Sequence, residues 1–140
     1  MRSWGMTRGE LIEARTTGAV ISAFFEVYNC LGFGFLESVY VKALECELVA
    51  GGHEIGREVW VPVLYKGHEL CRHRIDMIVD ERVVVEVKST PDLHPSSRRQ
   101  IENYLRCSKL EVGLLLHFGA SAKFHRLVAT NSPSSIRRAT

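Results

Sequence analysis

The sequence predicts an α/β fold in which helices flank a mixed β-sheet. Three observations support this prediction: two amphipathic segments at the start of the chain, a change to two-residue periodicity after residue 52, and an apolar run near residue 115. At 140 residues the chain has the size of one domain. We therefore expect a single domain over residues 9–128, a flexible N-terminus over residues 1–8 and a disordered tail over residues 129–140.

The first part of the predicted domain is helical. Apolar residues recur at helical spacing over residues 8–31, which predicts a first helix. The two glycines of LGFGF (residues 31–35) interrupt this pattern. LESVYVKALECELVA then predicts a second helix that ends at Gly51 and Gly52.

The pattern then changes to the alternation typical of strands. It predicts three strands, over residues 53–65, 68–80 and 81–89. Tight turns at Lys66-Gly67 and at Asp80-Glu81-Arg82 would join them into an antiparallel meander.

Three more elements complete the predicted fold. Pro95 precedes a segment that predicts a helix over residues 96–107. The apolar run LEVGLLLHF predicts a buried strand over residues 110–118, and a weaker strand follows over residues 123–128.

Composition limits the classes of function. Hydrophobic residues make up 46% and charged residues 24%, as in ordinary globular domains. A net charge of +2 is too small for non-specific coating of DNA, so any basic surface must be local. The four cysteines contain no Cys-x-x-Cys pair and indicate neither a zinc site nor a disulfide framework. No export signal or membrane-spanning run is visible, so we expect a cytoplasmic protein without a membrane partner.

The strand VVVEVKS (residues 83–89) carries charge in an apolar setting. Successive side chains of a strand point to opposite faces, so Glu86 and Lys88 share one face and the odd-numbered valines take the other. A three-residue turn before this strand would put Asp76 opposite Glu86, with Arg74 beside them. A two-residue turn would pair Asp76 with Val85 and send the carboxylates to opposite faces.

In the first of these registers the chemistry is informative. Two neighbouring carboxylates repel unless a cation lies between them. Mg²⁺ favours one or two carboxylates together with waters and phosphate oxygens, and an adjacent lysine can hold water or phosphate. Asp76, Glu86 and Lys88 would therefore form a reasonable set for cleaving phosphodiesters. The alternative is a surface ion pair between Glu86 and Lys88, worth about 0–1 kcal/mol.

Three motifs carry a resemblance to a known family. Asp76, nine residues and then Glu86-Val87-Lys88 resemble the core of the PD-(D/E)XK nucleases, although Ile75 replaces the proline of that name. GFLESVY (residues 34–40) matches the G-x-x-E-x-x-Y signature of the GxxExxY family within that superfamily. QIENYL (residues 100–105) is similar to its Q-x-x-x-Y helix motif.

The resemblance implies a restriction-endonuclease-like core and a set of site residues. The implied catalytic residues are Glu37, Asp76, Glu86, Lys88 and Gln100. Asp76 and Glu86 would bind Mg²⁺ or Mn²⁺ with support from Glu37, and Lys88 would position water or phosphate. Gln100 and Tyr104 would hold the site or the nucleic-acid backbone.

Other residues are candidates for supporting roles. Tyr40 lies on the same helical face as Glu37, where a core tyrosine with a satisfied hydroxyl is the ordinary expectation. Arg72 and Arg74 would share the face of Asp76 and contact the nucleic-acid backbone. The histidines fit no metal motif, and only His94 attracts attention, because it follows the Glu-Val-Lys strand.

These observations favour a metal-dependent nuclease that hydrolyses phosphodiester bonds by metal-activated water. DNA is the expected partner, RNA is the alternative substrate, and a homodimer remains open. The alternative function is a non-catalytic module that keeps the nuclease fold and binds nucleic acid or protein.

Overall fold

The computed structural model describes residues 8–129. The elements are α1 (Arg8–Leu31), α2 (Glu37–Ala50), β1 (Ile55–Tyr65), β2 (His68–Val79), β3 (Val83–Lys88), α3 (Ser96–Ser108), β4 (Val112–Phe118) and β5 (Ala122–Val128). Each lies where the sequence predicts a helix or strand. The expected flexible N-terminus, apart from its last residue, and the expected tail from residue 130 lie outside the described residues. None of the helices in residues 8–129 has the length and hydropathy of a membrane-spanning segment.

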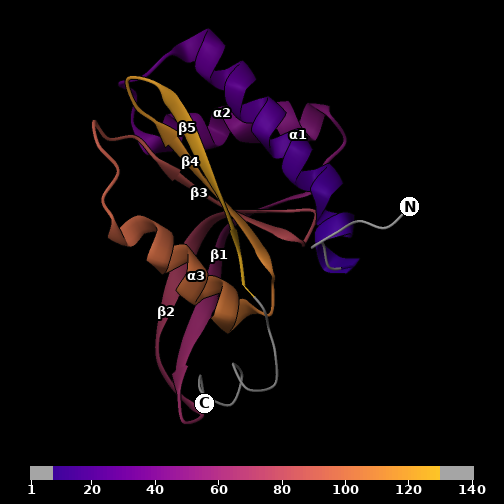
Figure 1. Ribbon diagram of the computed structural model, residues 1–140, viewed down its shortest axis with the longest axis vertical. Coiled ribbons are helices and arrows are strands. Elements are labelled where there is room, and N and C mark those ends of the chain that lie inside the picture. The colour runs from indigo at the N-terminus through magenta and orange to yellow at the C-terminus, as the bar shows by residue number, and fades with distance from the viewer. Residues whose placement is uncertain (1–7, 130–140) are drawn as a thin grey trace.

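The five strands form one mixed sheet in the order β1-β2-β3-β4-β5. The first three form the predicted antiparallel meander, β3 and β4 run parallel, and β5 returns antiparallel to β4. Parallel neighbours need a crossover connection, which α3 supplies. The β1–β2 hairpin extends beyond the rest of the sheet, at the lower end of Figure 1.

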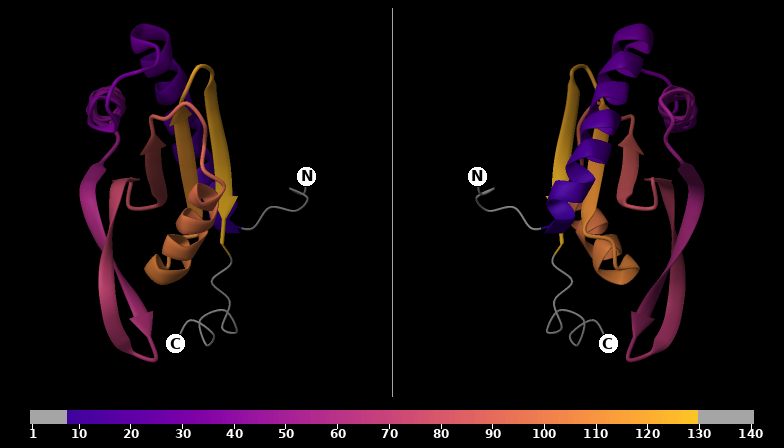
Figure 2. Two further views of the ribbon diagram at one scale, coloured as in Figure 1. Left: turned by 90° about the vertical axis from the view of Figure 1, so that its left-hand side faces the viewer. Right: turned by 90° about the vertical axis from the view of Figure 1, so that its right-hand side faces the viewer.

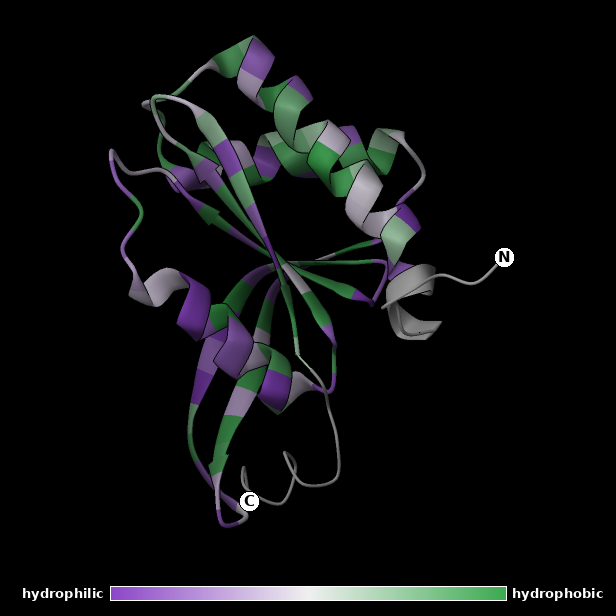
Figure 3. Ribbon diagram, viewed as in Figure 1, coloured by the Kyte–Doolittle hydropathy of each residue, from purple (hydrophilic) through white to green (hydrophobic). Residues whose placement is uncertain are grey.

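Helices cover both faces of the sheet. In the two side views of Figure 2, α3 lies in front of the sheet in one view and α1 in the other. One apolar cluster joins α1 and α2 to the odd-numbered valines of β3, and a second joins α3 to the opposite face. Every residue of β4 is buried, because both of its faces are covered. Figure 3 shows mostly hydrophilic residues along α3, whose buried residues are Ser97, Ile101 and Leu105.

A glycine on β4 sets the distance between α3 and the sheet. A Cβ atom on Gly113 would lie 2.8 Å from Cγ2 of Ile101 on α3. Protein interiors are packed too tightly to absorb that overlap without a shift of the helix. Gly113 therefore lets α3 lie close over the centre of the sheet, where the polar residues of α3 can reach β2 and β3.

The β2–β3 turn has the length that the functional prediction requires. Val79 pairs with Val83, so the turn comprises the three residues Asp80, Glu81 and Arg82. The carboxylate of Asp80 accepts hydrogen bonds from the Glu54 N–H at 2.9 Å and the Thr16 hydroxyl at 3.2 Å. This register places Asp76 opposite Glu86, as predicted.

The regular alternation of β2 breaks at Asp76. Ile75 packs in the cluster under α3, whereas Met77, two residues later, packs in the cluster under α1 and α2. The distortion also involves β1, because Glu58, which lies between the partners of Ile75 and Met77, has a φ of 55° and is left out of the pairing. One residue on each strand is left out of the pairing here, Glu58 on β1 and Asp76 on β2, so the register is kept while the regular pairing is interrupted.

Candidate active site

Two carboxylates meet where β2 and β3 separate. The regular pairing stops at Met77 and Val85, and beyond it the side chains bond to the backbone of the opposite strand. The Asp76 N–H donates to Oε1 of Glu86 at 3.0 Å, and the Val87 N–H donates to Oδ2 of Asp76 at 2.9 Å. The open ends of the two strands are therefore held by the carboxylates themselves.

The carboxylate pair is short of positive charge. Glu86 is only 7% exposed. Burial raises the pKa of Glu86 to about 7, and the negative charges of Asp76 and Glu37 act in the same direction. The Asp76 N–H and the Lys88 ammonium oppose this shift without cancelling it. A perturbed pKa of this size on a carboxylate beside a second carboxylate is typical of a functional site.

The donor atoms fit a hard divalent cation. Asp76 and Glu86 offer oxygen ligands only, which Mg²⁺ and Mn²⁺ prefer, and a cation between them would relieve their repulsion. In residues 8–129, however, no three His, Cys, Asp or Glu side chains are grouped closely enough to form a ready-made metal site. The arrangement thus resembles a two-carboxylate site that completes its coordination with water or substrate oxygens.

Glu37 lies at the start of α2, close to the end of β3. Its Oε2 accepts a hydrogen bond from the Ser89 N–H at 3.2 Å, and its negative charge contributes to the raised pKa of Glu86. Glu37 therefore lies near the pair, but the backbone of the β3–α3 loop already engages its carboxylate.

The glycine and tyrosine of the G-x-x-E-x-x-Y motif fix the conformation of the loop between α1 and α2. The hydroxyl of buried Tyr40 donates to the Gly32 carbonyl at 2.8 Å and accepts from the Phe35 N–H at 3.3 Å. Gly34 has a φ of 106°, a conformation that other residues rarely adopt. Tyr40 therefore holds the loop that precedes Glu37 through two hydrogen bonds. It is a core tyrosine with a satisfied hydroxyl, as the sequence predicts.

Lys88 ends β3 on the same side as Glu86. It is partly buried and lies in register with His117 of the parallel strand β4. Its positive charge lowers the pKa of both Glu86 and His73, although burial is the larger cause for His73. The ammonium group is thus close enough to act on the carboxylates and on any group bound between them.

Tyr104 faces the site from α3, and Gln100 lies one turn before it. The Tyr104 ring stacks on His73 of β2, with centroids 3.7 Å apart and planes 13° from parallel. Burial raises the pKa of Tyr104, and the charge of Glu86 raises it further. Gln100 is exposed, and its side chain makes no hydrogen bond to any of the described residues. The stacked rings of Tyr104 and His73 therefore lie near the carboxylates, and Gln100 lies one turn earlier on α3.

The expectation that Arg72 and Arg74 share the face of Asp76 stays a prediction, because neither arginine contacts Asp76 or Glu86 among the described residues. His73 lies between them and faces Tyr104, so the side chains on either side of it point to the opposite face. The predicted alternation does not continue through the distortion at Asp76. Arg72 instead pairs with Glu69 at 3.1 Å, and Arg74 pairs with Glu58 at 3.6 Å.

Sequence reasoning missed two histidines near the site. His117 is buried, and its Nε2 lies 2.8 Å from the Thr90 carbonyl, so it fixes the loop after Lys88. A polar residue in the apolar run LEVGLLLHF was the available signal. His73 gave no signal, because its role depends on where α3 lies. His94 has a structural role, since its Nδ1 accepts the Ser96 N–H at the start of α3.

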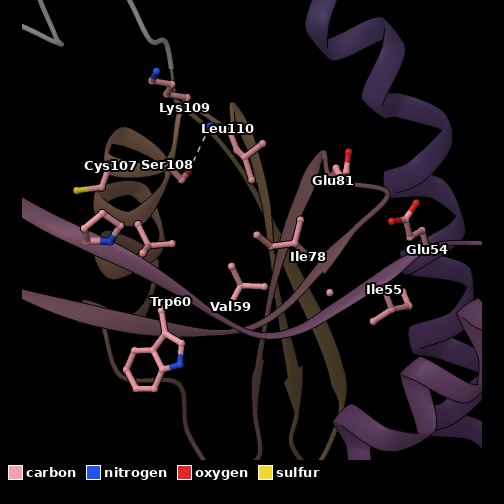
Figure 4. A pocket seen from close by; sticks show the side chains of 13 residues that line it. Glu54, Ile55, Val59, Trp60, Ile78, Glu81, Cys107, Ser108, Lys109 and Leu110 are labelled. Atoms are coloured by element: carbon pink, nitrogen blue, oxygen red, sulfur yellow. Dashed lines mark hydrogen bonds between the residues drawn. The ribbon is translucent and has the colours of Figure 1, made fainter.

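Two hollows lie outside the carboxylate pair. One, of about 820 Å³, adjoins Glu37 at the start of α2. The other, of about 520 Å³, lies between β1 and the C-terminal end of α3, where Val59, Ile78 and Leu110 gather (Figure 4). None of the predicted site residues lines this second hollow. It is therefore separate from the candidate active site.

The chain is similar to solved structures and to one family model. The solved structure of SSO0001 shares 18% sequence identity and a TM-score of 0.55, over 94% of this chain and 66% of that chain, which shows a common fold. An alkaline exonuclease (LHK-Exo) from Laribacter hongkongensis shares 10% identity over 83% of this chain and 81% of that chain, with a TM-score of only 0.45. No curated protein matches the chain. The family model of the PD-(D/E)XK nuclease superfamily matches residues 14–127. Since this match spans most of the sequence, the chain belongs to the PD-(D/E)XK nuclease superfamily.

Proposed function

We propose that the protein is a metal-dependent nuclease that hydrolyses phosphodiester bonds in DNA, with RNA as the alternative substrate. The observation that supports this most strongly is the pairing of Asp76 with buried Glu86 at the open ends of two strands. Structural carboxylates are normally given enough donors to satisfy them, whereas this pair keeps a raised pKa on Glu86.

Each acidic residue has a proposed role in holding a cation. Asp76 and Glu86 would bind Mg²⁺ or Mn²⁺, and Glu37 would serve as an outer ligand. When bound, such an ion neutralises charge that develops on a phosphoryl group and lowers the pKa of a bound water. Glu86 must be ionised for this role, and the positive charge of Lys88 favours its ionised form.

Lys88 and the residues of α3 would act on the substrate directly. The Lys88 ammonium can donate a hydrogen bond to the attacking water or to a phosphate oxygen. Tyrosine is protonated at neutral pH, and burial raises the pKa of Tyr104 further, so its hydroxyl can donate to the nucleic-acid backbone. Gln100, one turn away and exposed, can contact the same strand.

Within the superfamily we assign the chain to the GxxExxY group. The support is the part that the motif residues play in this structure. Gly34 permits the turn, Tyr40 holds it, and Glu37 is thereby brought to the end of β3.

A cleavage assay tests the proposal. Labelled DNA and RNA strands would be incubated with Mg²⁺ and with Mn²⁺, using wild-type protein, Glu86→Ala and the control Asp92→Asn. Asp92 is an exposed acid in the β3–α3 loop whose side chain is not part of the pair. We expect cleavage by wild type and by the control and no cleavage by Glu86→Ala. A Glu86→Ala protein that still cuts would reject the assignment.

Metal binding can be followed separately from turnover. We expect Mn²⁺ to raise the melting temperature of the wild-type protein and to leave Asp76→Asn unchanged. Indifference of the wild-type protein to Mn²⁺, together with salt-sensitive binding of DNA, would favour the non-catalytic binding module instead.

A further inference from the structure

The loop between α1 and α2 exposes three neighbouring apolar side chains. Phe33 is 60% exposed, Phe35 46% and Leu36 77%. Single exposed apolar residues are ordinary, but a contiguous group of them marks an interaction surface. We call this group, residues 33–36, the apolar loop.

The apolar loop is held in place despite its exposure. The Phe35 N–H donates to the Tyr40 hydroxyl, and the Ser89 hydroxyl donates to the Phe35 carbonyl. The Phe35 ring meets the Tyr40 ring edge to face, with an angle of 82° and centroids 6.0 Å apart. A loop fixed in this way loses little conformational entropy when a ligand binds to it.

The apolar loop also lies directly beside the candidate active site. It lines the hollow of about 820 Å³, and Glu37 and Ser89 line the same hollow. Volumes of this size are common for ligand sites. Phe35 precedes Glu37 by two residues, so their Cα atoms lie within about 7 Å of each other. Ser89, which also lines the hollow, directly follows Lys88 at the end of β3, so a nucleotide whose phosphate lies at the carboxylate pair could place its base in the hollow.

The charge of the residues that line the hollow favours binding of a base over binding of a phosphate. Among the described residues that line it there is no lysine, arginine or histidine, and the one charged side chain is the carboxylate of Glu37. A phosphate backbone would be repelled there, and the outside of a duplex presents that backbone. A planar, uncharged base could instead contact the exposed aromatic rings of Phe33 and Phe35.

We propose that the apolar loop stacks unpaired nucleobases, so that the preferred substrate is single-stranded nucleic acid. The inference rests on the proposed function, because it takes the carboxylate pair beside Glu37 as the place where the phosphate is cut. Stacking of one base on an aromatic side chain typically strengthens binding about tenfold, and it tolerates any base sequence.

Binding without added metal tests the stacking by itself. The ligands would be a labelled single strand of about 12 nucleotides, a strand of equal length with abasic sites in place of bases, and a duplex of the same sequence. The variants are Phe33→Ala, Phe35→Leu and the control Trp60→Ala. Trp60 is 58% exposed on β1, outside the apolar loop. Phe33→Ala keeps the test valid if Phe35→Leu destabilises the fold.

We expect wild type and Trp60→Ala to bind the base-bearing strand about tenfold more tightly than the abasic strand and the duplex, and Phe33→Ala to lose most of that preference. Equal binding of base-bearing and abasic strands by wild type would overturn the inference. So would a dimer that Phe33→Ala dissociates without any change in strand preference, because the loop would then serve a second copy of the chain. A base preference that depends on Phe33 in a protein that cuts no strand with Mn²⁺ would uphold this inference and reject the proposed hydrolysis alone.

Discussion

The β2–β3 hairpin carries acidic side chains at both ends, and the two ends treat them in opposite ways. Burial alone would raise the pKa of Asp80 at the turn, but hydrogen bonds from His53 and from the Glu54 N–H lower it below the ordinary value. At the open end, burial and the charge of Asp76 raise the pKa of Glu86 to about 7. The hydrogen bonds made to Asp80 hold the turn, whereas the donors near Asp76 and Glu86 do not offset the burial of Glu86. The balance of hydrogen-bond donors around a carboxylate, and not its presence in a strand, therefore separates a structural acid from a candidate catalytic one.

The largest expected effect comes from removing the positively charged side chain of Lys88 at the open end of the hairpin. Lys88→Ala should lower the cleavage rate about 100-fold or more, because a positioned donor to the reacting group is lost. The stabilisation by Mn²⁺ should remain, since Lys88 is not a proposed ligand. Single-turnover cleavage at saturating Mn²⁺ measures the rate, and Lys42→Ala, on the exposed side of α2, is the control. A wild-type rate in Lys88→Ala would remove this residue from the mechanism.

Stability should depend on pH through Glu86. Its pKa rises from 4.5 to about 7 on folding, so between these values the folded protein binds a proton that the unfolded chain does not. The contribution of Glu86 to the free energy of unfolding should therefore be largest below pH 4.5 and should fall by about 3 kcal/mol as the pH rises to 7. Urea unfolding in EDTA across this range measures it.

Glu86→Gln should flatten that pH profile and be more stable than wild type at pH 8. Glu47→Gln, at an exposed position near the end of α2, should leave the profile unchanged. An identical slope in wild type and Glu86→Gln would show that folding does not raise the pKa of Glu86.

At the closed end we expect a loss of stability and no loss of chemistry. Asp80→Ala removes the acceptor for three donors and should lower the free energy of unfolding by about 1–3 kcal/mol, while the Mn²⁺ response persists. The lowered pKa of Asp80 means that its contribution is present at neutral pH and lost on acidification through that pKa. Glu81→Ala is the matched control, because Glu81 has a φ of 57°, close to the 54° of Asp80. Equal losses in the two variants would assign the effect to backbone strain alone.

The smallest effect should follow from changes to Arg72 and Arg74, which lie on the face away from Tyr104. Their exposed ion pairs with Glu69 and Glu58 contribute about 0–1 kcal/mol each. Arg72→Ala and Arg74→Ala should change binding of a single-stranded DNA by about twofold at most, as measured by a salt titration. A larger loss with a salt dependence weakened by about one phosphate contact would return the arginines to the nucleic-acid interface.

Local patterns were enough to predict the elements and to bring the acids together in one of two registers. The alternation in β3 separates Glu86 and Lys88 from Val83, Val85 and Val87, and the three-residue turn fixes the register. Because register follows from turn length, the sequence left two registers open, and the observed three-residue turn selects the one that brings Asp76 to Glu86. The same reasoning does not decide the faces of Arg72 and Arg74, since it assumes that alternation continues through Asp76, where the pairing of β2 is interrupted. Nothing in the sequence marks the distortion at Glu58.

By itself, the sequence determined which segments are helices and strands, which face of β3 carries charge, and which motif residues are present. Those properties depend on periodicity and turn length over a few residues. Only the tertiary structure decided that His73 stacks on Tyr104, that Ser89 ties Glu37 to the end of β3, and that the apolar loop lies beside the acids. These contacts join residues far apart in the chain. Their geometry depends on how closely α2 and α3 pack against the sheet, and no local pattern encodes that distance.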